Sequence, residues 1–198
     1  MSELIALDVA VMPPPDVAAK AIALSAALPA AEPEVLRLDD EHLPHITLMQ
    51  LFARVNELEE ALSRVDETLR GVATLPLRIT GAGQGAHTLW MAVEKLPQLV
   101  ELHERLMETL RGVERPDGGT GAFFGGDARL RDVLWVAGYR LKSSFHHYEP
   151  HITLGHGSAP PHVEPITFTA DTVAVCHLGK YCTCRRILRQ WTLTGAAA

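Results

Sequence analysis

The pentapeptide Pro-His-Ile-Thr-Leu occurs twice in the chain, beginning at Pro44 and again at Pro150. Each copy places a histidine two residues before a threonine, which gives the matching pairs His45 with Thr47 and His151 with Thr153. An imidazole titrates near neutral pH, so two histidines can serve as general base and general acid. A threonine hydroxyl can donate a hydrogen bond to a phosphoryl oxygen. The repeat therefore predicts acid–base chemistry on a phosphate ester that requires no metal ion.

Strand geometry explains how both pairs could face one site. Successive side chains of a strand point to opposite faces, so Ile46 and Leu48 are expected in a core while His45 and Thr47 lie together on the other face. The second copy repeats this arrangement, and each proline restricts the backbone just before its histidine. A repeat of about 100 residues is too long for a solenoid period and too short for two independent domains. It suggests two related lobes that face each other.

The remaining segments predict a mixed α+β protein. Apolar residues at helical spacing predict helices over 16–28, 56–70, 97–111 and 130–141, the second of them capped by Asn56. Apolar runs predict strands over 4–11, 36–38, 45–52, 75–80, 87–94, 151–155, 166–169, 172–178 and 181–193. Gly179-Lys180 is expected to close the last two strands as a two-residue hairpin, and 112–126 is the longest expected loop. We expect residues 1–198 to form a single catalytic domain of two lobes.

Composition and charge limit the classes of function. The net charge of the 198 residues is −6, which argues against a broad nucleic-acid-binding surface because such surfaces are basic. Residues 129–198 nevertheless carry a balance of +4, against −10 for 1–128. A local basic region suits a small anionic ligand or a strand end, although a chance imbalance explains the charge equally well. The odd number of cysteines, together with no sign of a signal peptide or membrane span, predicts a cytoplasmic protein without a disulfide framework.

The two motifs resemble those of the 2H phosphoesterase superfamily, which is named for a pair of His-x-Ser/Thr motifs. Both His45-Ile-Thr47 and His151-Ile-Thr153 match, including the apolar residue after each threonine. The sequence is most similar to the bacterial 2′-5′ RNA ligase-like and 2′,3′-cyclic phosphodiesterase group. The likeness extends to the strand at 89–93, to Tyr148-Glu-Pro150 and to a terminal hairpin that ends near Trp191. The glycine-rich segment 112–126 departs from the family pattern and leaves substrate size open.

The resemblance implies a fold, a reaction and a site. The fold is a pseudo-twofold pair of α+β lobes with largely antiparallel sheets around a central groove, as in LigT-like proteins. The implied substrate is a nucleotide or RNA terminus that bears a cyclic phosphate, hydrolysed with no cofactor, no membrane and no obligate protein partner. The same residues could also seal a 2′-5′ linkage in reverse. The catalytic residues would be His45, His151, Thr47 and Thr153, and we favour His151 as base and His45 as acid. A nucleotide- or RNA-binding module of the same fold, with little catalysis, is the alternative.

Several residues outside the motifs are candidates for substrate contacts. Tyr148, Lys142 and Arg140 precede the second motif closely and are expected to line the groove or approach the phosphate. Phe123 and Phe124, in the glycine-rich segment, either stack on a base as a lid or anchor the long loop to the body, which is the simpler interpretation. Gly81-Ala-Gly-Gln-Gly85 lacks the glycine spacing and the following helix of a phosphate loop, so we interpret it as a strand-connecting turn.

A cluster of thiols near the C-terminus offers a different chemistry. With a two-residue hairpin at Gly179-Lys180, His177 would lie opposite Cys182, and Cys184 would share that face. These groups, next to Cys176, could converge on zinc in a zinc-dependent protein. Reduced thiols in a half-buried hairpin are the alternative, and we favour it because ligands on adjacent strands rarely complete a tetrahedron. We therefore predict no metal.

Overall fold

Eight strands build one curved sheet that places the two sequence motifs side by side at its centre. The computed structural model describes residues 3–29, 35–86 and 88–195. The strands are β1 (Leu4–Met12), β2 (Ile46–Arg54), β3 (Leu75–Gln84), β4 (Thr88–Val93), β5 (His151–His156), β6 (Ile166–Ala170), β7 (Thr172–Leu178) and β8 (Cys184–Thr192). They are hydrogen-bonded in the order β6-β3-β4-β5-β2-β1-β7-β8, with every pair antiparallel.

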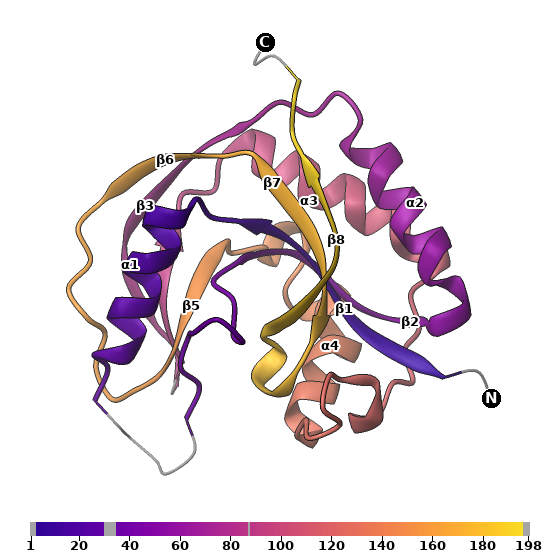
Figure 1. Ribbon diagram of the computed structural model, residues 1–198, viewed down its shortest axis with the longest axis horizontal. Coiled ribbons are helices and arrows are strands. Elements are labelled where there is room, and N and C mark those ends of the chain that lie inside the picture. Colours follow the sequence, from indigo (N-terminus) through magenta and orange to yellow (C-terminus); the bar gives the residue numbers. More distant parts are fainter. Residues whose placement is uncertain (1–2, 30–34, 87, 196–198) are drawn as a thin grey trace.

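Helices cover both faces of this sheet. The α-helices of the described chain are α1 (Pro15–Ala26), α2 (Leu58–Leu69), α3 (Pro97–Thr109) and α4 (Leu130–Lys142). Helices α1, α2 and α3 pack on one face of the sheet, and α4 packs on the other. In Figure 1, α1 lies at the left of the view, α2 and α3 lie at the right, and α4 lies at the bottom beside the turn between β7 and β8. No helix of the described segments combines the length and the apolar character needed to cross a membrane.

The two halves of the sheet are related by a pseudo-twofold that passes between β2 and β5. These strands carry the repeat, and they pair through the equivalent residues Ile46 and Ile152. Strands β2-β1-β7-β8 extend to one side and β5-β4-β3-β6 to the other, so the β1–α1–β2 connection corresponds to the connection from β4 through α3 to β5. The predicted duplicated α+β fold is confirmed, with both lobes built on one continuous sheet.

A β-bulge interrupts both copies of the repeat at the same residue. The β1–β2 register omits Leu48 between Thr47 and Met49, and the β4–β5 register omits Leu154 between Thr153 and Gly155. An extra residue in one strand inverts the alternation of side chains beyond it. In β2 the bulge therefore places the side chain of Gln50 on the same face as His45. Strict alternation along the strand would have placed it on the opposite face.

Each bulge is held from behind by a helix of the opposite half. The Ser25 hydroxyl of α1 donates to the Leu154 carbonyl, and the buried imidazole of His103 in α3 bonds through Nδ1 to the Leu48 carbonyl. Ser25 Oγ and His103 Nε2 then accept the backbone N–H groups of Leu38 and Phe145 respectively. Because a carbonyl displaced from the ladder needs a buried donor, these two contacts fix the aim of both motif strands.

The protein has a large core beneath the sheet and a smaller one on the groove side. The large core gathers residues of α1, α2 and α3 against one sheet face. The smaller core joins α4 and the glycine-rich segment to the other face through apolar residues that include Ala6, Phe52, Phe123, Val136 and Leu178. The Phe123 ring meets the Phe52 ring edge-on at 5.7 Å between centroids. The long predicted loop is thus anchored to the body.

The two-residue turn predicted at Gly179-Lys180 is wrong, although β7 and β8 do form a hairpin. Five residues, 179–183, connect β7 to β8, and the register pairs Leu178 with Cys184. Tyr181 and Cys182 have φ values of 67° and 56° within this turn. Asp132 of α4 accepts a hydrogen bond from the Tyr181 backbone N–H at 3.2 Å, a tertiary contact that holds the longer turn. Local turn chemistry did not foresee it.

Other element boundaries differ by less. Helix α2 begins at Leu58 after a 3-10 turn, and Asn56 does not cap it. The predicted strand at 36–38 is reduced to one bridge, from Arg37 to Gly155. Strand β3 continues through the predicted glycine turn as far as Gln84. His87, the predicted first residue of the next strand, lies outside the described residues.

Candidate active site

The two motif histidines are held in the same way at the edge of one groove. His45 immediately precedes β2 and His151 begins β5, and both line a groove of about 690 Å³ together with Thr47 and Thr153. Nδ1 of His45 lies 2.7 Å from the carbonyl of Leu43, and Nδ1 of His151 lies 2.7 Å from that of Glu149. A carbonyl only accepts, so Nδ1 carries the proton of the neutral ring. Nε2 is thereby left to exchange a proton at the site.

Burial and mutual proximity set the titration of both imidazoles. His45 is 7% exposed, and burial lowers its pKa. Burial also lowers the pKa of His151, and the charge of His45 lowers that pKa further. Desolvation disfavours a charged ring, and two cations repel each other at close range. The site therefore disfavours having both rings protonated at once.

Asp8 on β1 is a site residue that the sequence patterns missed. Its carboxylate Oδ2 accepts hydrogen bonds from Thr47 Oγ1 at 2.8 Å and Gln50 Nε2 at 2.7 Å, and it lies 3.7 Å from His45 Nε2. The side chain is fully buried, and this burial raises the pKa of Asp8 to about 7. The sequence does contain one indication of this role, since Asp8 is the only charged residue in the otherwise apolar run 4–11. A buried charge is costly unless it is paired or hydrogen-bonded.

The hydroxyl groups of the two motif threonines differ in their hydrogen bonds. The Thr47 hydroxyl donates to Asp8, whereas among the described residues the Thr153 hydroxyl has no hydrogen-bond partner. Tyr148 supports Thr47 from below, because its hydroxyl donates to the Thr47 carbonyl at 3.0 Å and its ring stacks on His103 at 3.9 Å. Tyr148 thus lines the groove as predicted, but it is buried and holds the first motif in place.

The wall of the groove beside His151 is aromatic. Trp90 on β4 lies opposite Thr153 in the register, and its ring centroid is 5.4 Å from that of His151. A Cβ atom on Gly83 would overlap Trp90 Nε1, so this glycine makes room for the indole. The predicted turn at 81–85 is therefore wrong, since residues 81–84 form the end of β3 and Gly83 makes room for Trp90, which lines the groove.

The cations of the groove come from the start of α4 and not from its end. Arg129 and Arg131 line the groove, and the Arg129 guanidinium lies 3.9 Å from the centre of the Tyr181 ring while it pairs with Asp132. Neither Arg140 nor Lys142 lines the groove. Arg140 pairs with Glu114 at 2.6 Å, and Lys142 is exposed at the helix end.

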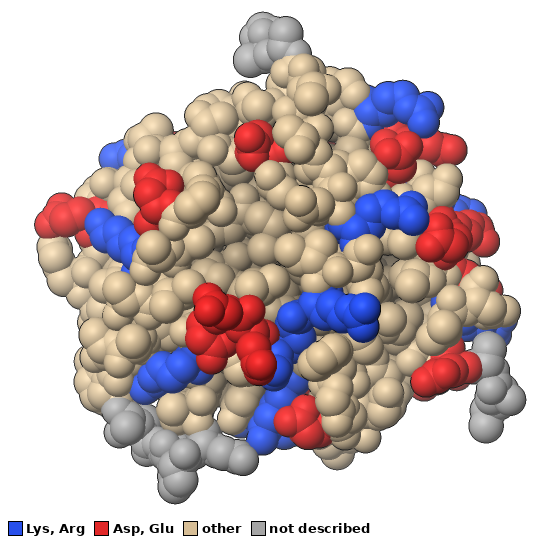
Figure 2. Space-filling model, in the orientation of Figure 1, with Lys and Arg blue, Asp and Glu red and all other residues tan. Residues whose placement is uncertain are grey.

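The phenylalanines of the glycine-rich segment also lie away from the groove. Phe123 is buried in the smaller core, and Phe124 contacts the His177 ring edge-on at 5.7 Å. Neither lines the groove, so the anchoring interpretation fits their positions. Figure 2 shows acidic and basic side chains interspersed on the face it presents, with no continuous basic surface of the kind a long duplex would need.

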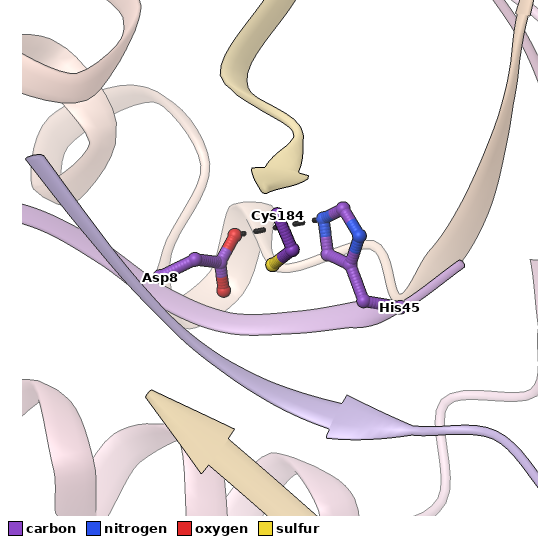
Figure 3. Close-up of side chains that lie close together, drawn as sticks. All are labelled: Asp8, His45 and Cys184. Atoms are coloured by element: carbon purple, nitrogen blue, oxygen red, sulfur yellow. Dashed lines mark ion pairs between the residues drawn. The ribbon is translucent and has the colours of Figure 1, made fainter. Parts of the chain in front are cut away.

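The predicted alternative zinc cluster does not assemble. His177 Nε2 lies 3.0 Å from the Ala122 carbonyl, and Cys182 belongs to the turn before β8. Cys184 instead approaches Asp8 and His45 (Figure 3). One ligand atom from each of these three buried residues lies within 4.8 Å of the others, and within the described ranges no other set of three or more such residues does so.

Comparison with known proteins places this fold among solved structures. TT0787 of Thermus thermophilus aligns with a TM-score of 0.65 at 20% identity, over 98% of this chain and 100% of that chain. The E. coli protein LigT in complex with 3′-AMP aligns with a TM-score of 0.60 at 21% identity, over 98% of this chain and 99% of that one. LigT in complex with phosphate gives 0.62 at 20% identity, with the same coverage. At these identities the likeness establishes the fold alone.

Sequence comparison establishes the family. No curated protein sequence matched the chain significantly. The profile described as the 2′-5′ RNA ligase superfamily matches residues 13–176, which include both His-x-Thr motifs and all four α-helices. This chain therefore belongs to the 2′-5′ RNA ligase superfamily of 2H phosphoesterases.

Proposed function

We propose that this protein hydrolyses a 2′,3′-cyclic phosphodiester, at an RNA end or on a nucleotide, by two-histidine acid–base catalysis without a metal. The observation that carries the proposal is the matched pair of imidazoles, each fixed through Nδ1 and each leaving Nε2 for one shared groove. A general base and a general acid within reach of one phosphate are what a displacement at phosphorus requires.

The reaction needs one neutral and one protonated imidazole. His151 Nε2 takes a proton from water as the water oxygen bonds to phosphorus. The bond from phosphorus to one ribose oxygen breaks, and His45 Nε2–H protonates that oxygen. The product is a phosphomonoester, and proton exchange with solvent restores both rings. With a ribose 5′-hydroxyl in place of water, the same base and acid would open the cyclic phosphate with loss of the 3′-oxygen and so seal a 2′-5′ linkage.

Asp8 supports His45 as the acid. A buried anionic oxygen 3.7 Å from Nε2 stabilises the protonated ring. The carboxylate that raises the pKa of His151 is that of Glu149, which is exposed to solvent and therefore screened. Because the Thr47 hydroxyl donates to Asp8, we assign phosphoryl stabilisation first to Thr153.

The remaining groove residues suit a nucleotide. Trp90, Trp135 and Tyr181 provide ring faces on which a base can stack, and Arg131 is an exposed cation for an anionic group. Solved structures of LigT, which shares the fold, contain phosphate, 3′-AMP, ATP or NADP⁺. These bound molecules support an anionic nucleotide as the class of ligand for this groove.

The decisive assay is a panel of 2′,3′-cyclic nucleotides and cyclic-phosphate oligonucleotides with excess chelator present. We expect turnover to a single phosphomonoester regioisomer, identified by chromatography against 2′- and 3′-phosphate standards. His151→Ala serves as the matched inactive control. Tight binding of the panel without turnover would instead favour a nucleotide-binding module of the same fold.

A further inference from the structure

The Cys184 thiol lies behind His45, where the proposed reaction has no use for it. Cys184 begins β8 and is fully buried, as is Asp8 on β1. In Figure 3 the Cys184 side chain lies between the Asp8 carboxylate and the His45 imidazole. The ligand atoms of the three residues lie within 4.8 Å of one another. Three segments far apart in sequence thus bring oxygen, nitrogen and sulfur donors to one point.

A second observation points to a missing cation. Asp8 Oδ1 is buried and has no hydrogen-bond partner in the described chain, and neither has the neighbouring amide oxygen Oε1 of Gln50. Unpaired buried acceptors are costly. The unpaired oxygen belongs to the carboxylate that lies beside the thiol and the imidazole, so a positive ion would be stabilised there.

The donor set fits zinc. Zn²⁺ binds cysteine sulfur at about 2.3 Å, histidine nitrogen at about 2.0–2.1 Å and carboxylate oxygen at about 2.0–2.2 Å, commonly with three protein ligands and one open position. Tetrahedral ligands at those lengths lie roughly 3.3–3.7 Å apart. The His45 Nε2 to Asp8 Oδ2 distance is already 3.7 Å, so closure requires a movement of about 1 Å by the thiol. The groove side of His45 supplies the open position.

We propose that Asp8, His45 and Cys184 form an inhibitory zinc site, in which the ion captures His45 Nε2 and removes it from proton transfer. On binding, the Cys184 thiol releases its proton to solvent and the thiolate bonds to the ion. The His151 half has no counterpart among the described residues, because Thr88 stands at the position equivalent to Asp8. The inhibition rests on the proposed function, whereas binding of the ion does not.

Cobalt substitution tests binding without any assay of activity. We expect Co²⁺ alone, added to the full-length protein under reducing conditions, to give the visible bands of a four-coordinate site and a near-ultraviolet thiolate-to-cobalt charge-transfer band. Cys184→Ala should lose the charge-transfer band. Cys182→Ala is the matched control and should retain it, because Cys182 lies outside the cluster. Absence of the band in the wild-type protein, or its persistence in Cys184→Ala, would overturn the site.

Zinc titration of turnover tests the consequence. We expect Zn²⁺ to inhibit hydrolysis of a 2′,3′-cyclic nucleotide and chelator to restore it. Cys184→Ala should keep its zinc-free rate and require at least about 10–100-fold more Zn²⁺, since even the loss of a partner outside the ligand set weakens metal binding that much. Equal inhibition of both proteins would refute capture of His45, and loss of turnover with chelator would contradict an inhibitory role. A cobalt band in a protein that hydrolyses no cyclic phosphate would retain the site and reject the proposed function.

Discussion

The two half-sites share a backbone and differ in what lies behind each histidine. Both bulge at the leucine of the repeat, and both tie Nδ1 to the carbonyl two residues earlier. In the first half, Asp8 and Gln50 oppose each other across the ladder. The equivalent pair in the second half is Thr88 and His156. The duplication thus sets where the reactive nitrogens lie, and the unmatched neighbours give each nitrogen its own electrostatic surroundings.

Replacing either motif histidine should cause the largest loss of kcat, and the two losses should be similar in size. We expect His45→Ala and His151→Ala each to lower kcat on a 2′,3′-cyclic nucleotide by on the order of 10²–10⁴, the usual contribution of a positioned acid or base. The double variant should be little worse than either single variant, because both transfers serve one step. Wild-type turnover by His45→Ala on every cyclic phosphate tested would exclude the two-histidine mechanism.

Replacing Asp8 should show how the two half-sites differ, because the equivalent residue of the second half is Thr88. We expect Asp8→Asn to lower kcat by about 10–100-fold, the equivalent of a charged hydrogen bond worth about 1.5–3 kcal/mol. Loss of the anion lowers the pKa of His45 further, so the alkaline limb of the kcat profile, where the acid loses its proton, should move to lower pH. Thr88→Val, at the matched position, should change kcat by about threefold at most and leave the limb in place. Equal effects of the two variants would contradict the assigned roles.

The same Asp8→Asn change should stabilise the fold at high pH. The pKa of Asp8 is raised from 3.8 to about 7 in the folded protein. Its neutral form therefore contributes stability that is present below pH 4 and is lost as pH rises through 7, by about 4 kcal/mol at most. Urea unfolding should show that the free energy of unfolding of Asp8→Asn, relative to that of the wild type, is higher at pH 8 than at pH 5.

Asp132 provides a control of opposite sign for this measurement. Burial opposes ionisation of its carboxyl, but the hydrogen bonds and charge of Arg129 prevail and lower the pKa of Asp132. That contribution is present above the unfolded pKa and is lost as pH falls through the folded value. Asp132→Asn should therefore destabilise the protein at both pH values. A stability difference for Asp8→Asn that is the same at pH 5 and pH 8 would show that its carboxyl is not desolvated as described.

The smallest effect should come from the aromatic wall of the second half. Gly83→Ala places a Cβ against Trp90 Nε1, so the indole must move. We expect kcat/KM to fall by about 3–10-fold with little change in kcat, since a displaced stacking surface worth about 1 kcal/mol affects binding first. Gly119→Ala is the matched control, because nothing lies within 4 Å of its Cβ. Unchanged kcat/KM in Gly83→Ala would remove Trp90 from substrate recognition.

Much of the fold and the centre of the site were predictable from the sequence because they rest on local periodicity and an internal repeat. The duplicated motif predicted two related halves, and alternation along each strand predicted that Ile46 and Leu48 would be buried, as they are. Amphipathic spacing located all four α-helices to within a few residues. The family follows from the same motifs, since the matching profile spans both.

Tertiary structure alone decided which other groups lie beside His45 or line the groove. Asp8 comes from β1, Cys184 from β8 and Arg129 from the start of α4, and no spacing in the sequence links them to His45. Arg140 and Lys142 lie nearer to the second motif in sequence, but the helix carries them away from the groove. A strand or helix fixes only the direction of its own side chains. Sheet order, two bulges and the five-residue β7–β8 turn determine which of those directions meet, and these depend on packing between distant segments.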